Sequence, residues 1–195
     1  MHPEAGAAPR RRHRLTLERE GQLYAVVLDE LRGSGYDVLT MDAIAAQSRC
    51  SKATLYRKWQ GKPQLVAAAL RHSFRLAPLD AGSLADDLYE LTRRISDTRD
   101  VELARIIGPA CDKNADLAEA LHEAIVQPVL DLLRQIIERA VARGELEPNN
   151  PTAEFLPHMI SGAVFARPFI ERCEADAEYL KRYMDNVVLP ALVRN

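Results

Sequence analysis

Apolar residues recur along the chain at the spacing of α-helices. From Leu17 they return every three or four positions until Gly33 and Gly35 interrupt the pattern. Two short segments, 40–47 and 51–59, follow with the same periodicity, and each begins with a residue that caps helices well. The pattern predicts three helices in this part of the chain.

The rest of the chain continues in the same way. Further helices are predicted over residues 63–76, 83–98, 101–111, 116–143, 152–170 and 176–193. Pro128 lies inside the longest of these and predicts a kink or a break there. Gly144 ends that helix, and Pro148 with Pro151 marks a loop. No segment reads as a strand, so the predicted fold class is all-α.

The two short helices, joined by Ser48–Cys50, have the size of a helix-turn-helix, a motif whose second helix lies in the major groove of DNA. Leu55 and Trp59 lie four positions apart and face the core. The residues left facing outward are Lys52, Ala53, Thr54, Tyr56, Arg57 and Lys58. Base edges accept hydrogen bonds from Lys and Thr, whereas Tyr and Lys suit phosphates.

The charge of the chain supports a nucleic-acid partner only after the chain is divided. The 26 Lys and Arg and 28 Asp and Glu give −2 overall, which argues against a polyanion binder. Residues 1–62 carry 11 basic and 7 acidic side chains, or +4, and the remainder carries −6. Residues 1–16 are predicted to form a disordered basic arm, with DNA contact and a solubilising tail as open alternatives.

Lys62 begins the fourth predicted helix, where a cation opposes the helix dipole. A phosphate at the same place would reverse the sign, because backbone amides and the ammonium would then bind one anion together. The alternative is a solvated lysine of little consequence.

These residues resemble the DNA-binding domain of the TetR (tetracycline-repressor-like) transcriptional regulators. The resemblance covers about Leu23 to Leu70 and rests on Gly35, Tyr36, Leu39–Asp42, Ile44, Ala45, Ser51–Trp59, Lys62 and Leu65. It implies a three-helix DNA-binding domain, a larger helical ligand-binding domain and a homodimer formed by the last two helices. The corresponding division is an arm at 1–16, a helix-turn-helix domain at 17–62, a connecting helix at 63–76 and a ligand-binding and dimerisation domain at 77–195.

The resemblance also assigns roles to individual residues. By position, Thr40, Tyr56 and Lys62 resemble phosphate contacts. The residues that resemble base-facing positions are Lys52, Ala53 and Thr54, and Lys58 fits either role. Ser51, Arg57 and the turn residue Arg49 complete the predicted DNA-binding set.

The turn departs from the family pattern, which usually has Gly followed by Val where this chain has Arg49 and Cys50. Arg49 would have to adopt a left-handed conformation at a cost of roughly 1 kcal/mol. Either the turn differs slightly, or a phosphate contact by Arg49 offsets this cost. Cys50 is expected to be a small buried hydrophobe rather than a redox switch.

The remainder shows no catalytic constellation, and neither an enzyme activity nor a cofactor is expected. The three cysteines are far apart and form no metal or disulfide pattern, which fits a reducing cytoplasm. No stretch reaches the roughly 20 apolar residues of a membrane span, so no membrane partner is expected.

A ligand pocket follows from the resemblance alone. Its candidate lining residues are Phe74, Tyr89, Ile106, Cys111, His122, Ile125, Met159 and Phe165. The same residues would suit an ordinary helical core. The last two helices carry a broad apolar surface, from which the predicted dimer residues are Leu156, Ile160, Val164, Tyr183 and Val187. Two well-buried helices of a monomer are the alternative.

The sequence thus predicts a homodimeric repressor that binds a roughly palindromic operator in double-stranded DNA and is released by an unidentified small molecule through the fourth helix. Two alternatives stay open. One is a helical metabolite-binding protein or enzyme with a degenerate DNA-binding head, and the other is an architectural protein that binds DNA without sequence preference.

Overall fold

The computed structural model describes residues 16–74, 77–96 and 100–193, and within these ranges the chain is helical with no strand. The all-α prediction is confirmed. The basic arm predicted for residues 1–16 lies outside the described residues except at its end. There Thr16 begins the first helix instead, because its hydroxyl accepts the N–H of Arg19 at 3.3 Å.

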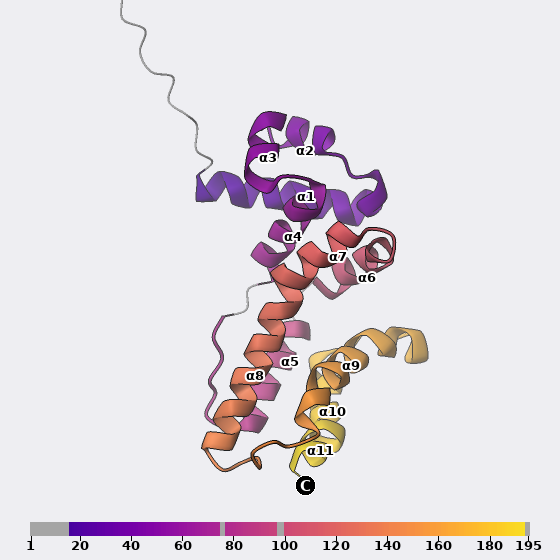
Figure 1. Cartoon of the computed structure of the whole chain (residues 1–195). Helices are drawn as coiled ribbons and strands as arrows, with labels where there is room; N and C mark the ends of the chain where they lie inside the picture. The colour runs from indigo at the N-terminus through magenta and orange to yellow at the C-terminus, as the bar shows by residue number, and fades with distance from the viewer. Residues whose placement is uncertain (1–15, 75–76, 97–99, 194–195) are drawn as a thin grey trace, which may run out of the picture.

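Four helices form one end of an elongated molecule (Figure 1). They are α1 (Leu17–Val38), α2 (Met41–Gln47), α3 (Lys52–Trp59) and α4 (Lys62–Ser73). The sequence predicts that Gly33 and Gly35 end the first helix, and of these two Gly35 is where the helical conformation is interrupted. The φ of Gly35 is 78°, a left-handed conformation that glycine adopts without steric cost. A last helical turn after this break brings Tyr36 into the core.

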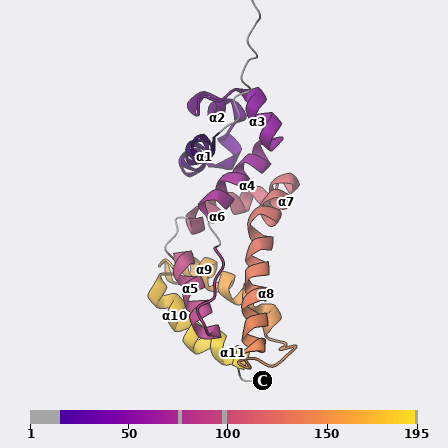
Figure 2. The ribbon, with the colours of Figure 1, turned by 90° about the vertical axis from the view of Figure 1, so that its left-hand side faces the viewer.

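The remaining helices form the body of the molecule. They are α5 (Leu84–Ser96), α6 (Asp100–Cys111), α7 (Ala115–Leu121), α8 (Gln127–Ala142), α9 (Leu156–Glu171), α10 (Ala177–Tyr183) and α11 (Leu189–Val193). Short turns named η1 (His122–Val126), η2 (Ala153–Phe155) and η3 (Met184–Val188) connect some of them. Figure 2 shows α4 leading from α1–α3 toward this body. The predicted helix ends at Leu76 and Thr98 lie outside the described residues.

The break predicted at Pro128 is confirmed, and it takes the form of a π-helical turn. Proline has no N–H to donate and its ring crowds the carbonyl four residues earlier, so the regular hydrogen-bond pattern cannot pass through it. In η1 the N–H of Gln127 reaches back five residues to the carbonyl of His122. The same arrangement precedes Pro190, where Leu189 donates to Met184. Gly144 ends α8 as predicted, with a φ of 75°.

The core of α1–α4 continues into the body. Leu23, Val27, Leu55 and other residues of these helices share one buried cluster with residues of α6 and α7, among them Ile107 and Leu117. A second cluster joins α5, α8, α9 and α11. Because packed interiors transmit displacement, a movement of α6 or α7 would also displace the helices at the N-terminal end. The division into domains at residues 76 and 77 stays a prediction.

Among the described residues, none of the helices combines the length and the apolar character needed to span a membrane.

Candidate DNA interface and cavity

The helix-turn-helix is held by local hydrogen bonds that the sequence predicts. Thr40 caps α2 by accepting the N–H of Ala43 at 3.2 Å, and Ser51 caps α3 by accepting the N–H of Thr54 at the same distance. Leu55 and Trp59 are buried, as their spacing requires. The indole of Trp59 donates to the hydroxyl of Tyr24 at 3.3 Å and meets its ring edge-on, which docks α3 on α1.

The turn between the two helices adopts the strained conformation expected at Arg49. Its φ is 51°, and its N–H donates to the carbonyl of Ala46 at 3.3 Å. The guanidinium is exposed and has no ion-pair partner among the described residues. Cys50 is half-buried and packs against the core, as expected of a small hydrophobe. An exposed cation therefore stands at the tip of the turn.

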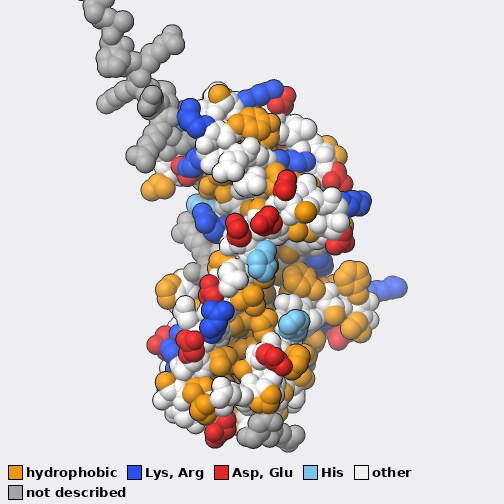
Figure 3. All heavy atoms as spheres, in the orientation of Figure 1, with side chains coloured by type: hydrophobic (Ala, Val, Ile, Leu, Met, Phe, Trp, Pro, Cys, Tyr) orange, Lys and Arg blue, Asp and Glu red, His pale blue; other side chains and the backbone are white. Residues whose placement is uncertain are grey.

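The outward face of α3 carries both cations that form ion pairs and a cation that does not, within the described part of the chain. Lys52 pairs with Asp42 of α2 at 2.5 Å, and Lys58 pairs with Glu20 of α1 and lies over the Trp59 ring. Arg57, by contrast, is exposed and has no such partner within the described part of the chain. Tyr56 is 50% exposed beside it. Figure 3 shows several blue side chains over the end of the molecule formed by α1–α3.

Lys62 is engaged inside the protein rather than extended toward solvent. Its Nζ donates to the carbonyls of Tyr36 at 2.9 Å and Leu39 at 3.0 Å, and it lies 4.1 Å from the centre of the Tyr36 ring. These carbonyls close the end of α1, where a cation is favourable. They compensate within the chain for the unfavourable position of Lys62 at the start of α4. We therefore revise its role to holding the α1–α2 connection.

Tyr36 links this connection to the body. Its hydroxyl lies 3.5 Å from the side-chain amide nitrogen of Asn114, the residue that caps α7. Burial, followed by the nearby Cys111 and the carboxylates of Asp116 and Asp37, raises the pKa of Tyr36 to about 12. The phenol therefore stays neutral and remains a hydrogen-bonding group at this junction.

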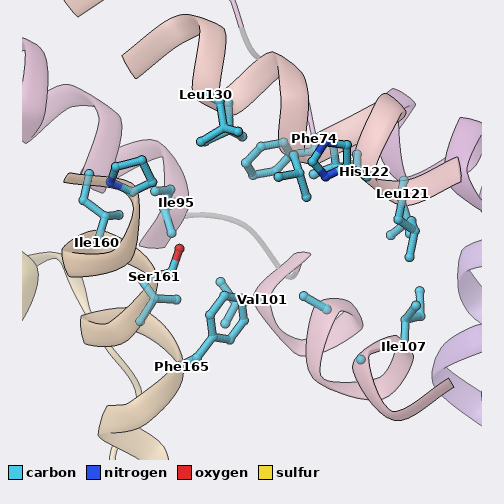
Figure 4. A pocket seen from close by; sticks show the side chains of 18 of the residues that line it. Phe74, Ile95, Val101, Ile107, Leu121, His122, Leu130, Ile160, Ser161 and Phe165 are labelled. Carbon is cyan, nitrogen blue, oxygen red and sulfur yellow. The ribbon is translucent and has the colours of Figure 1, made fainter. Parts of the chain in front are cut away.

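A cavity of about 490 Å³ lies in the body between α4, α5, α6, α7, η1, α8 and α9. Hydrophobic side chains line a hollow in the face of the body seen in Figure 3, and Figure 4 shows the cavity walls from close by. Leu70 and Phe74 of α4 contribute to its wall. The cavity therefore borders the helix whose other end holds the α1–α2 connection.

Some of the predicted pocket residues line this cavity. The predicted residues that line it are Phe74, Cys111, His122, Ile125 and Phe165. Burial, followed by the charge of Asp112, raises the pKa of the Cys111 thiol, which therefore acts as a small apolar group. No group of three or more His, Cys, Asp or Glu side chains is arranged to hold a metal ion in the described ranges.

The prediction was wrong for three pocket residues. The hydroxyl of Tyr89 donates to Asp185, and its ring lies under Lys181, so Tyr89 faces α10 and η3 instead. Met159 packs against the second core cluster. Ile106 is half-buried on α6 but does not line the cavity, whereas its neighbour Ile107 does. The lining residues that sequence reasoning missed include Ile107, Leu121, Val129, Leu133, Ile160 and Ser161.

Comparisons with known proteins agree with this arrangement. The profile of bacterial regulatory proteins of the tetR family matches residues 28–69, and that of the tetracyclin repressor-like C-terminal domain matches residues 78–187. An HTH-type transcriptional regulator of Mycobacterium tuberculosis is 34% identical over 183 residues, which is 91% of this chain and 89% of the relative. The chain belongs to the TetR family.

A further relative and two solved structures are also similar to this chain, and the structures show the same fold. A DNA-binding transcriptional repressor of Mycobacteroides abscessus, TetR, is 30% identical over 177 residues, covering 88% of this chain and 92% of the relative. GusR of Salmonella enterica has the same fold, with a TM-score of 0.68 at 20% identity over 94% of this chain and 100% of that one. The flavonoid-responsive regulator FrrA superposes with a TM-score of 0.64 at 22% identity, covering 87% and 93%.

Membership establishes the class of function. The chain is a DNA-binding transcriptional regulator with a helix-turn-helix head and a helical C-terminal part. TetR-family regulators bind DNA operators and act as dimers with small-molecule effectors, and they are generally not enzymes.

The predicted dimer residues of this TetR-family chain need correction. Leu156, Ile160 and Val164 are at most 5% exposed, because they pack into the cores of their own chain. Tyr183 is half-buried, and Val187 is 41% exposed. The large apolar side chains that α9 does leave exposed are Phe165, Phe169 and Ile170.

Proposed function

We propose that the chain is a repressor that binds a palindromic operator as a homodimer and leaves it when a small molecule fills the cavity. The observation that carries this proposal is the placement of α3, which is capped and docked on α1 while its other face is exposed. Because bacterial relatives have their chromosome in the cytoplasm, we propose that the protein works there.

The outward face of α3 suggests how DNA is read. Lys52, Ala53 and Thr54 stand at the start of the helix, which is the part that approaches base edges when a recognition helix enters the major groove. Lys52 forms an exposed ion pair with Asp42. Binding of Lys52 to a base therefore requires that this pair open. Exposed pairs are worth at most about 1 kcal/mol, so opening costs little.

Phosphate contacts are assigned to the exposed groups around α3. Thr40, Ser51 and Tyr56 carry exposed hydroxyl groups, and Arg49 and Arg57 carry guanidinium groups without a partner in the described part of the chain. Guanidinium groups match phosphate oxygens in geometry and charge. Lys58 is held by Glu20 and contributes less net charge to this surface.

A second copy of the chain would supply the second recognition helix of the operator complex. Phe169 is 82% exposed and Ile170 78% exposed at the end of α9, where they accompany Phe165 on the same helix. Exposed apolar groups of this size on neighbouring turns are typical of an interface between subunits. We place the dimer contact on these residues and Val187, in place of the buried residues named from the sequence.

Coupling between cavity and head is supported by two contacts. Phe74 and Leu70 bring the end of α4 into the cavity wall, while Lys62 at its start holds the α1–α2 connection. Asn114 meets Tyr36 next to the same connection. A molecule that fits the cavity better in one arrangement of α4 shifts the protein toward that arrangement and changes the separation of the two heads.

The proposal is tested by selecting bound duplexes from random DNA and measuring their affinity by fluorescence anisotropy at several salt concentrations. Arg57→Ala should weaken binding at least tenfold, because hydrogen bonds to charged groups contribute about 1.5–3 kcal/mol. Arg134→Ala removes the same charge from the exposed face of α8 and should leave binding unchanged.

Three results would contradict the proposal. Equal binding of all duplexes would indicate an architectural protein, and no binding at all would indicate a helical ligand-binding protein with an inactive head. Equal losses of DNA affinity in the Arg57 and Arg134 variants would show that α3 is not part of the DNA interface.

A further inference from the structure

The cavity wall is almost free of polar groups. Among its 22 described lining residues there is no Lys, Arg, Asp or Glu, and the side chains that can hydrogen-bond are His122, Ser161 and the weakly polar thiol of Cys111. Burying a charged group in such surroundings costs several kcal/mol unless a partner compensates it. The wall therefore selects against charged molecules.

The size of the cavity suits a small organic molecule. Ligand sites usually enclose roughly 300–1,000 Å³ and are lined by hydrophobic side chains with a few polar groups that fix the orientation of the ligand. The cavity of about 490 Å³ falls in this range. The position of its few polar groups then decides how a ligand is oriented.

His122 and Ser161 lie on different walls, one on η1 and the other on α9 (Figure 4). Neither side chain has a hydrogen-bond partner among the described residues, so both can bind a ligand. They differ in their neighbours. The turn η1 packs against α4, whose end residue Phe74 lines the same cavity, whereas Ser161 belongs to the helix with the exposed apolar side chains.

We propose that the effector is an uncharged, mostly apolar molecule with a hydrogen-bonding group that His122 binds. This inference rests on the proposed function, since it names the class of molecule that acts on the repressor. Binding at His122 places the polar end of the effector beside η1 and α4, and its apolar part against the aliphatic and aromatic wall. His122 is the first residue of the π-helical turn that precedes Pro128.

Three compounds that share the naphthalene ring system test the charge preference. Naphthalene, 2-naphthol and 2-naphthoate are titrated at pH 8 against the fluorescence of N-phenyl-1-naphthylamine bound to the full chain. We expect 2-naphthoate to compete at least tenfold more weakly than 2-naphthol. Equal or stronger competition by 2-naphthoate would overturn the proposal.

Variants of the two polar residues test the assignment to His122. His122→Leu should abolish the advantage of 2-naphthol over naphthalene, which we expect to be about 2- to 12-fold because a neutral hydrogen bond contributes about 0.5–1.5 kcal/mol. His122→Asn should retain part of it, and the matched variant Ser161→Ala should retain all of it. Equal losses in the Leu and Ala variants would overturn the role of His122.

A gain of binding separates these effects from a failure to fold. Ser161→Arg places a cation in the wall and should raise the affinity for 2-naphthoate at least tenfold relative to 2-naphthol; no gain would contradict the charge argument. Duplex binding is measured on the same samples. A protein that binds its selected duplex but prefers 2-naphthoate refutes the effector class alone. One that prefers 2-naphthol but binds no duplex supports the effector class and refutes the repressor.

Discussion

Replacing Arg49 by glycine should make the protein more stable and its DNA binding weaker. The residue has a φ of 51° in the turn between α2 and α3. A left-handed conformation costs a residue with a Cβ roughly 1–2 kcal/mol, and glycine avoids this cost. Glycine also gives the unfolded chain more freedom, which offsets about 0.4–1 kcal/mol. We therefore expect Arg49→Gly to raise the free energy of unfolding by up to about 1.6 kcal/mol.

The same substitution removes an exposed guanidinium that has no partner in the described part of the chain. If Arg49 binds a phosphate, each subunit loses one contact. The slope of log affinity against log salt concentration then falls by about 0.9 per phosphate, or about 1.8 for a dimer. Affinity at low salt should drop at least tenfold, since a charged hydrogen bond contributes about 1.5–3 kcal/mol.

Urea denaturation and anisotropy titrations at several salt concentrations measure both effects. Arg49→Asn is a matched control, because asparagine tolerates the left-handed region but has no charge, and it should lose the same salt slope. Arg49→Lys should keep the slope. A salt slope unchanged in Arg49→Gly would refute the phosphate contact, and any measurable loss of stability would refute the strain.

Three further predictions follow from single contacts. Leu55→Ala should lower the free energy of unfolding by about 2–5 kcal/mol, because Leu55 is fully buried in the first core cluster; a smaller loss in urea denaturation would contradict this packing. Lys62→Met should cost about 1–3 kcal/mol, because two carbonyls lose their donor, and should leave the salt slope of DNA binding unchanged, whereas a reduced slope would restore Lys62 as a phosphate contact. Tyr89→Phe should raise the pKa of Asp185, which the hydrogen bond from Tyr89 and then Lys181 hold below its usual value. The stabilising effect of this carboxylate is present above its unfolded-state pKa and is lost as the pH falls through its lower folded-state pKa, so the variant should lose it at a higher pH. An NMR titration of the Asp185 carboxyl checks the shift, and an unchanged pKa would contradict it.

Features that depend on neighbouring residues in the chain could be predicted from the sequence. Thr40 and Ser51 cap α2 and α3 because a hydroxyl reaches the amides of the next turn whatever surrounds it. The strained turn at Arg49 and the break before Pro128 are of the same kind, since φ and the missing N–H are local properties.

Features that depend on distant residues could not be predicted. The carbonyls that bind Lys62 come from the end of α1, more than 20 positions away, and no periodicity indicates them. Periodicity shows which face of a helix is apolar but not what covers it. It therefore assigned Leu156 and Val164 to a second subunit, although their own chain buries them.

The residues that line the cavity could be predicted only in part, for the same reason. A residue that lines a cavity and one that fills a core have the same side-chain chemistry, so Met159 and Phe165 were equally good candidates. Only the packing of α9 against α8 and α6 separates them, with half-buried Met159 against the second core cluster and Phe165 at the cavity.

The most direct test of the account compares one selected duplex with a scrambled duplex of the same length at the same salt concentration. We expect two chains to bind the selected duplex, whose half-sites are related by a two-fold axis and centred about 10–10.5 base pairs, or a multiple, apart. We also expect an affinity for this duplex at least 10³-fold higher than for the scrambled one. Equal affinity for both, or one chain bound to an asymmetric site, would contradict the account.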